Sequence, residues 1–169
     1  MTAIEPTVIG SEPMKLLREY GHVVPALYAA FIFIQSLFFK FRNSPETRWI
    51  FETRLDTWAA GFGQAGLFAP GGIFSAKVVG SVELVAALLI LAGTFLAPYR
   101  VLQGLGALAG LVVISGALFF HLSGAIGIPV IGDDGKSDGG TLFVLACGVF
   151  VACLILIYLR RDKLLSLIS

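Results

Sequence analysis

The feature that most constrains the fold is the near absence of charge from four long stretches of the sequence. Residues 23–39, 78–96, 101–120 and 142–159 hold 17, 19, 20 and 18 residues, and Glu83 is the one acidic or basic residue among them. A transmembrane helix needs about 20 predominantly apolar residues, with a range of roughly 17–25. The 169-residue chain is 57% apolar and 14% charged, which leaves too little polar surface to cover four such stretches in water. We therefore predict an all-α membrane protein with four transmembrane helices in an antiparallel bundle.

The predicted organisation is one membrane domain with two short tails. The domain covers residues 22–161, with spans at about 22–41, 73–97, 99–121 and 140–159. Residues 1–21 form a polar tail, with a short interfacial helix expected near residues 14–20, and residues 162–169 form a short basic tail. The N-terminus has no apolar run after a basic start, so we predict no signal peptide.

Charge predicts the orientation and excludes one class of partner. Four spans place both termini on one side, and Arg160-Arg161-Asp162-Lys163 directly follows the last span. The positive-inside rule then predicts cytoplasmic termini, which we expect in a bacterial cytoplasmic (inner) membrane. A net charge of +1 gives no electrostatic footprint for nucleic acid, so we expect none as a partner.

The long first loop contains the pattern of an amphipathic interfacial helix over residues 45–61. Ser44 can cap it, Pro45 suits its first position, and Glu46 favours the positive end of the helix dipole. Its expected apolar face holds Phe51, Leu55, Trp58 and Phe62, and its polar face holds Arg48, Glu52 and Asp56, with Arg48 and Glu52 at pairing distance. Trp49 and Trp58 suit the headgroup layer. Two interpretations stay open, namely a membrane-surface anchor and a lid over a binding site.

Small residues predict close helix packing in the second and third spans. Gly80 shares a face with Ala76, Glu83 and Ala87, and Gly106 and Gly110 form a GxxxG motif. Cys147 and Cys153 lie six residues apart on a helix and face different ways, which argues against a dithiol redox site. The last loop contains Asp133, Asp134 and Asp138, but their spacing does not match a calcium-binding loop. We expect a solvated turn there and no metal site.

Three polar residues, Lys40, Glu83 and His121, belong to the same half of the bilayer in this topology. Lys40 ends the first span, His121 ends the third, and Glu83 lies about ten residues, roughly 15 Å, into the second. A charged carboxylate at that depth costs roughly 2.5–3.5 kcal/mol on insertion scales. Protonation could relieve this cost, and so could pairing with Lys40 or His121. A register-fixing ion pair, a polar ligand site and a proton path all stay open.

At these residues the sequence resembles the DoxX family of small four-span bacterial membrane proteins, over roughly residues 24–161. The resemblance rests on Phe38-Phe39-Lys40-Phe41 before Ser44-Pro45-Glu46, on the segment from Lys77 through Gly80 to Glu83, on Phe119-Phe120-His121, and on Arg160-Arg161. The glycine that the family usually has ahead of the lysine is absent here, and this sequence has Gln35 and Ser36 in that region instead. The resemblance implies a four-helix membrane bundle with Lys40, Glu83 and His121 as shared polar positions. It also implies an association with redox-linked membrane proteins, since some relatives are subunits of a thiosulfate:quinone oxidoreductase.

The functional hypothesis from these patterns is a non-catalytic module that binds a small amphipathic ligand, either a quinone or a lipid. Lys40 and His121 would donate hydrogen bonds to a carbonyl or headgroup, and Glu83 would hold Lys40 in place. One alternative is a scaffold or chaperone-like subunit of a membrane complex, with a second membrane protein or a copy of itself as partner. The other is a small-solute or proton-coupled transporter.

Overall fold

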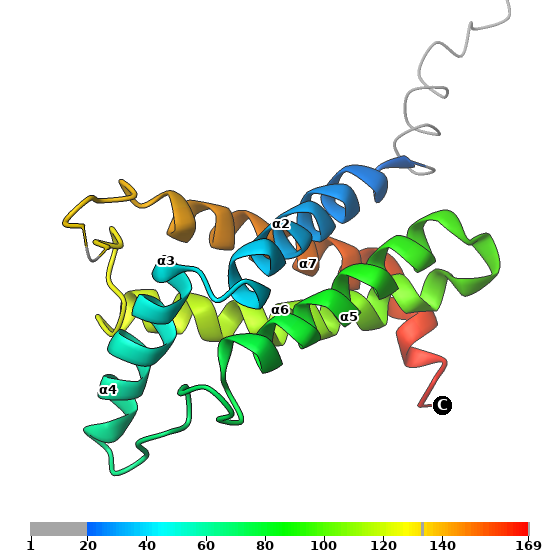
Figure 1. Cartoon of the computed structure of the whole chain (residues 1–169). Helices are drawn as coiled ribbons and strands as arrows, with labels where there is room; N and C mark the ends of the chain where they lie inside the picture. Colours follow the sequence, from blue (N-terminus) through cyan, green and yellow to red (C-terminus); the bar gives the residue numbers. More distant parts are fainter. Residues whose placement is uncertain (1–19, 133, 169) are drawn as a thin grey trace, which may run out of the picture.

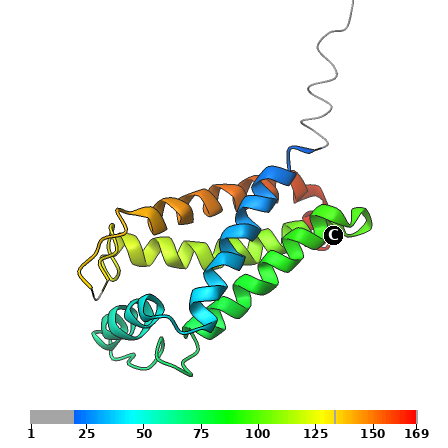
Figure 2. The same ribbon diagram turned by 45° about the horizontal axis from the view of Figure 1, so that its top comes forward.

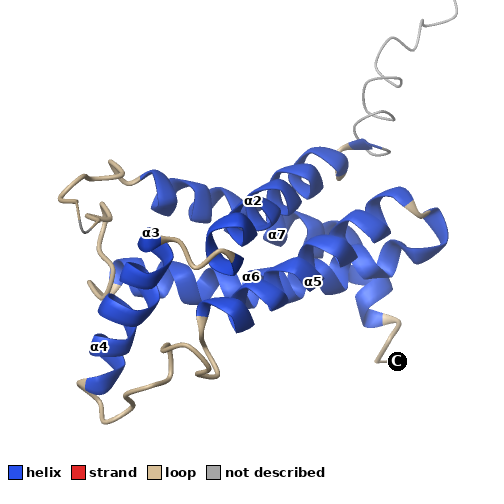
Figure 3. Ribbon diagram, in the orientation of Figure 1, coloured by secondary structure: helices blue, strands red, loops and turns tan. Residues whose placement is uncertain are grey.

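The computed structural model describes residues 20–132 and 134–168, and within these ranges it contains helices, turns and loops but no strand (Figure 3). Four long helices dominate: α2 (Val23–Phe41), α5 (Ala76–Phe95), α6 (Arg100–Leu122) and α7 (Thr141–Leu165). Each is long and apolar enough to cross a membrane. The all-helical prediction and its four spans are thus confirmed, and they indicate a multi-pass membrane protein. The predicted N-terminal tail and its short helix lie, up to residue 19, outside the described residues.

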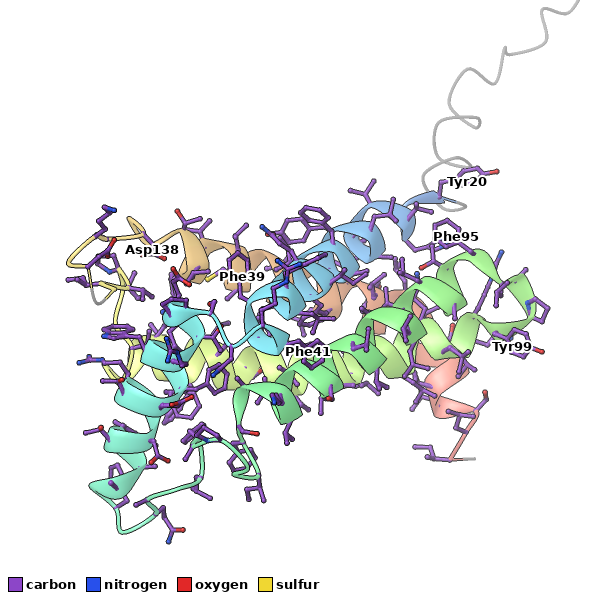
Figure 4. The ribbon with its side chains drawn as sticks, in the orientation of Figure 1. Tyr20, Phe39, Phe41, Phe95, Tyr99 and Asp138 are labelled. Carbon is purple, nitrogen blue, oxygen red and sulfur yellow. The ribbon has the colours of Figure 1, made fainter. Side chains whose placement is uncertain are left out.

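The four helices pack around an interior built mostly from small side chains. Helix α6 packs against α5 and α7, and α2 packs against α5 and α7, so that α2 crosses α5 while α6 and α7 run alongside each other (Figures 1 and 2). The core contains many alanines, among them Ala29, Ala86 and Ala107, around the larger Phe33 and Ile90. About a third or less of each span is buried. The remaining apolar side chains project outward (Figure 4), where hydrocarbon would cover them.

The bundle has two distinct ends. We call the end that carries Tyr20, the C-terminus of α7 and the short turn η2 (Ala97–Tyr99) the terminal end (Figures 1 and 4). The opposite end, the loop end, carries the chain between α2 and α5 and the loop between α6 and α7 (Figure 1). Exposed Tyr20, Phe95 and Tyr99 lie at the terminal end, as expected for aromatic side chains at a membrane surface.

Two helix boundaries differ from the predicted spans. Helix α5 begins at Ala76 instead of residue 73, because the chain first turns through Gly71, at a φ of 88°, and reaches an extended Ser75 before the helix. Helix α7 continues to Leu165 instead of ending near residue 159, so Asp162 and Lys163 are helical rather than part of the predicted tail. A helix satisfies its own backbone groups and can leave the apolar layer without ending.

Gly106 and Gly110, the predicted packing glycines of α6, lie at close contacts in the bundle. A Cβ atom on Gly106 would lie 2.7 Å from both the Ala86 oxygen and the Ile90 nitrogen of α5. A Cβ on Gly110 would lie 2.9 Å from the Phe33 ring of α2. At Gly106 the neighbours are backbone atoms, so only a displacement of a whole helix could make room.

We expect Gly106→Ala to lower the thermal stability of the detergent-solubilised protein, because a methyl group there separates α5 from α6. Overpacking of this kind typically costs about 1–3 kcal/mol. Gly116→Ala is the matched control, since it lies in the same helix and its Cβ would meet nothing within 4 Å. The control should be neutral or stabilising, because alanine favours a helix over glycine by roughly 0.5–1 kcal/mol. Equal melting temperatures for the two variants would contradict the close approach.

Candidate functional site

The central polar contact of the bundle joins Lys40 of α2 to Glu83 of α5. The Lys40 Nζ atom lies 2.6 Å from Oε2 and 2.8 Å from Oε1 of Glu83. Their side chains are 15% and 7% exposed, so the ion pair is largely shielded from its surroundings. The partner of Glu83 is therefore Lys40 and not His121, which decides between the two pairings that the sequence left open.

Ser36 is a third member of this contact that the sequence analysis did not assign. Its hydroxyl lies 2.6 Å from Glu83 Oε2 and 2.7 Å from the Phe33 carbonyl oxygen, and it accepts a hydrogen bond from Lys40 Nζ at 3.2 Å. Its single proton has the stronger acceptor in the carboxylate. The spacing of four residues between Ser36 and Lys40 places both on one helix face, which is the sequence signal for this unit. We call Ser36, Lys40 and Glu83 the α2–α5 polar unit.

The three N–H donors of the Lys40 ammonium are all directed at the other members of this unit. Two of them face the Glu83 carboxylate and the third faces the Ser36 hydroxyl. The lysine stem passes beside Gly80, one turn before Glu83, where an added Cβ would be in ordinary contact with Lys40 Cδ at 3.4 Å. An ammonium has no further donor. A ligand could therefore bind Lys40 only by displacing a contact that already exists.

The depth of Glu83 is smaller than the sequence indicated. Helix α5 begins at Ala76, so Glu83 lies about 10 Å along the helix and not the roughly 15 Å counted from Ile73. Lys40 lies in the last turn of α2, at the same end of the bundle. The pair therefore belongs to the outer part of the bundle near the loop end, where a lysine stem can lead its charge toward the surface.

His121 lies at the loop end but belongs to a different contact. Its Nδ1 atom is 2.8 Å from the Gly127 carbonyl oxygen, and its ring packs edge-on against Phe143, with the centroids 5.7 Å apart. Because a carbonyl only accepts, Nδ1 carries the proton. No hydrogen bond to Nε2 forms within the described part of the chain. His121 is 7% exposed and connects α6 to the following loop.

The predicted interfacial helix is present over residues 45–60, but its middle is wound differently. It comprises α3 (Pro45–Arg48), the π-helical segment η1 (Trp49–Leu55) and α4 (Asp56–Ala60). The cap is as predicted, since Ser44 Oγ accepts from the Thr47 amide at 3.2 Å and Pro45 takes the first helical position. Within η1 the hydrogen bonds span five residues, as from the Asp56 amide to the Phe51 carbonyl.

This winding changes which face of the helix is buried. The buried residues recur every four positions, at Thr47, Phe51, Leu55 and Ala59. The predicted apolar face followed the period of an α-helix and ended at Phe62. In the structure Phe62 lies beyond the helix and is 68% exposed. Trp58 is half-buried against the Phe120 ring, at a centroid distance of 5.4 Å. A π-helical turn holds more residues than an α-helical one, which keeps a four-residue repeat on one face.

The polar residues of this helix fasten it to the loops around it. The Asp56 carboxylate accepts from the amides of Gly66 and Phe68 at 2.9 and 3.0 Å, and Arg54 Nε donates to the Ala125 carbonyl at 3.0 Å. The expected pair of Arg48 and Glu52 does not form, and no ion pair of either occurs among the described residues. The wider turn of η1 separates these residues from their α-helical spacing.

The helix therefore lies across the loop end as a fixed cover. Phe51, Leu55 and Ala59 pack with Phe68 and with apolar residues of the loop after α6, among them Ile126. A cavity of about 100 Å³ opens beside it, between η1 and the start of α5, with Phe51, Glu52, Phe68 and Lys77 in its wall. Lys40, Glu83 and His121 are not among the residues that line it.

Asp138 organises the last loop, which the sequence analysis took for a solvated turn. Its carboxylate accepts hydrogen bonds from the amides of Val130, Gly140 and Leu142 at 2.8–2.9 Å. Burial alone would raise the pKa of this carboxyl, but the three amide donors and the nearby His121 lower it below its usual value. Asp138 thus ties the loop to the first turn of α7 (Figure 4). The sequence signal that could have identified this role is an aspartate shortly before an apolar span, where its carboxylate can accept from the first backbone amides of the helix.

The terminal end holds a second buried polar group, formed by Thr94, Gln103 and Arg160. The fully buried Gln103 donates from Nε2 to Thr94 Oγ1 at 2.7 Å and accepts at Oε1 from Arg160 Nε at 2.6 Å. It connects α5, α6 and α7. The sequence does not indicate this contact, because Arg160 is far from the other two residues in the chain and no local pattern marks any of the three.

Comparison with family models, curated proteins and solved structures finds no match for this chain. The resemblance to the DoxX family therefore stays a prediction that depends on its quoted motifs.

We expect single and double substitutions of the ion pair to differ sharply in stability. Glu83→Gln leaves the Lys40 charge without its partner, and loss of one member of a buried pair typically costs about 3–5 kcal/mol. The loss should lie near the lower value, because Lys40 keeps 15% exposure and can turn toward the surface. Lys40→Met combined with Glu83→Leu removes both charges and should restore most of the stability. Thermal unfolding in detergent tests this, and a double variant no more stable than the single one would contradict it.

Asp138 gives the loop end a defined dependence on acid. Because its pKa is lowered in the folded protein, its stabilising effect is complete above the unfolded-state pKa, about 3.9. The effect is lost as the pH falls through the lower folded-state pKa. We expect Asp138→Asn to lose about 0.5–1.5 kcal/mol at pH 7, the net contribution of one hydrogen bond, because its side-chain nitrogen cannot accept from the Leu142 amide. Below pH 4 the two melting temperatures should converge.

The control for this measurement is Asp134→Asn in the same loop. Asp134 is exposed and pairs with the exposed Lys136 at 3.0 Å, a contact that water and salt screen, so Asp134→Asn should leave the melting temperature nearly unchanged. If the melting temperatures of the wild-type protein and the Asp138→Asn variant kept a constant difference from pH 7 to pH 3, ionisation of the carboxyl group would contribute nothing to stability.

Proposed function

We propose that this chain is a non-catalytic, DoxX-like membrane module that serves as a scaffold subunit, with both termini in the cytoplasm. The observation that carries the proposal is the closed hydrogen bonding of the α2–α5 polar unit. Lys40 directs all its donors at Glu83 and Ser36, so the unit is complete without a ligand. A complete polar contact between two spans fixes their register.

A scaffold needs a rigid shape with surfaces for neighbours, and the arrangement of polar contacts supports this. Each end of the bundle is held by groups that join separate elements, with Lys40 and Glu83 near one end and Gln103 and Arg160 at the other. Between them the outward face is apolar on all four long helices. Such a body can lie against lipid or against a second membrane protein, including another copy of the chain.

A second candidate function is binding of a small amphipathic ligand, and the unused Nε2 atom of His121 favours it. The hypothesis from the sequence gives Lys40 and His121 the role of donors to a carbonyl. The hydrogen bonds of Lys40 already go to Glu83 and Ser36, whereas no hydrogen bond to His121 Nε2 forms within the described residues. His121 is therefore the one of the two that would contact the polar group of a quinone, a quinol or a lipid.

Native mass spectrometry after gentle extraction from the source membrane separates the two candidates. The scaffold predicts a second polypeptide, or a defined homo-oligomer, that stays bound when Lys40→Met and Glu83→Leu are combined. It also predicts that His121→Ala leaves this composition unchanged. A stoichiometric quinol or lipid that is lost with His121→Ala would instead establish the ligand-binding candidate. A monomer with neither partner nor ligand would contradict both.

A further inference from the structure

The terminal end carries basic side chains that the described residues do not neutralise. Residues 96–104 and 158–168 contain four basic residues and one acidic residue. The acidic one, Asp162, pairs with Arg161 at 3.7 Å, and Arg161 also stacks on the Tyr158 ring at 4.4 Å. In the described part of the chain, Arg100 and Lys163 form no ion pair.

Arg100 and Lys163 face one depression between α6 and α7. Its volume is about 450 Å³, and its wall combines these two cations with Ser166 and with apolar residues of the η2 turn and of both helices, namely Ala97, Pro98, Val101 and Leu167. Figure 1 shows the C-terminal end of α7 beside the turn that joins α5 to α6. A concave site of this volume with cations on one side and apolar walls on the other suits an amphipathic anion.

Arg160 adds to the positive potential beside this depression. Its Nε is held by the fully buried Gln103, while its Nη2 is the one buried side-chain nitrogen or oxygen that lacks a hydrogen-bond partner among the described residues. The charges of Arg100 and Arg160 repel each other. Arg160 is not among the residues that line the depression, so an anion there would relieve its repulsion with Arg100 without contacting Nη2.

The orientation of α6 also favours an anion at the depression. This 23-residue helix begins at Arg100, directly after η2, so the positive end of its dipole lies at the depression. Phosphate groups are the anions that combine well with arginine, lysine and helix amides.

We propose that the depression between α6 and α7 binds the phosphate headgroup of an anionic phospholipid. A lipid, and not free phosphate, suits the site because exposed apolar residues surround it at the end of the spans, among them Leu96, Tyr99 and Leu167. The acyl chains would continue along the outer face of the bundle, which faces hydrocarbon. Basic pockets between membrane helices recognise such headgroups. This site lies at the opposite end from Lys40, Glu83 and His121 and does not depend on the proposed function.

The test compares lipid binding to the full chain, purified in a neutral detergent, by native mass spectrometry and by thermal shift. The probes are dioleoyl phosphatidylglycerol, dioleoyl phosphatidylcholine and inorganic phosphate. The test variant combines Arg100→Gln with Lys163→Gln, which leaves Arg160 and its bond to Gln103 in place. The control is Lys136→Gln, an exposed lysine at the loop end with a side chain that is 85% exposed.

We expect phosphatidylglycerol to bind and stabilise the wild-type protein, with little effect of phosphatidylcholine or inorganic phosphate. The double variant should bind phosphatidylglycerol about thirty-fold more weakly, since each basic residue contributes about one kcal/mol to binding an anionic surface. The preference of the wild-type protein for phosphatidylglycerol over phosphatidylcholine should fall as the salt concentration is raised. Lys136→Gln should leave this preference unchanged. Equal binding of the two lipids, full binding by the double variant, or an equal shift with inorganic phosphate would each overturn the proposal.

Discussion

The placement of two opposite charges inside an apolar bundle is the constraint on which the arrangement of α2 and α5 depends. A carboxylate or an ammonium alone between these helices would be expensive. Lys40 and Glu83 lie 2.6 Å apart, and Ser36 supplies the remaining hydrogen bonds. The lysine stem lies against α5 at Gly80. Since each member has its partners at one relative position of the helices, a shift of α2 along α5 would expose both charges to hydrocarbon.

The buried polar groups fall into two kinds, those whose hydrogen-bond partners all lie within the protein and those that keep an atom without a partner. The α2–α5 polar unit and the Asp138 loop are complete, because each of their acceptors has protein donors. Among the described residues, His121 Nε2 and Arg160 Nη2 have no hydrogen-bond partner. Complete contacts stabilise a fold, whereas groups without a partner mark places where the packing is not closed. One such group lies at each end of the bundle.

The sequence predicted the elements that depend on local patterns. The four spans follow from apolar runs of 17–20 residues, and the Ser44 cap with Pro45 follows from residues that are adjacent in the chain. The common location of Lys40, Glu83 and His121 in one half of the bundle was derived from topology. Their actual contacts were not, because a rotation of each helix by a few tens of degrees decides which side chains meet. That rotation is set by close contacts such as Gly106 on Ala86.

Features formed by distant segments escaped the sequence analysis for the same reason. Nothing in residues 49–55 marks them as π-helical, and the burial of Thr47 and Ala59 in place of Phe62 depends on the loop that packs against them. The role of Asp138 depends on the backbone of Val130, eight residues earlier. Gln103 looks like a polar interruption of an apolar run until Thr94 and Arg160 are brought beside it.

The unequal lengths of the four helices have a consequence for the membrane around them. Helix α7 has 25 residues and is about 37 Å long, whereas α2 has 19 residues and is about 28 Å long. A hydrocarbon layer is about 30 Å thick, so α2 nearly matches it and α7 exceeds it. The excess is the charged segment 160–163, because the apolar residues 142–159 of α7 span only about 27 Å. Helix α7 therefore needs no thicker bilayer, and it carries these charges out of the hydrocarbon on a continuous helix, at a height above the membrane that the apolar run determines.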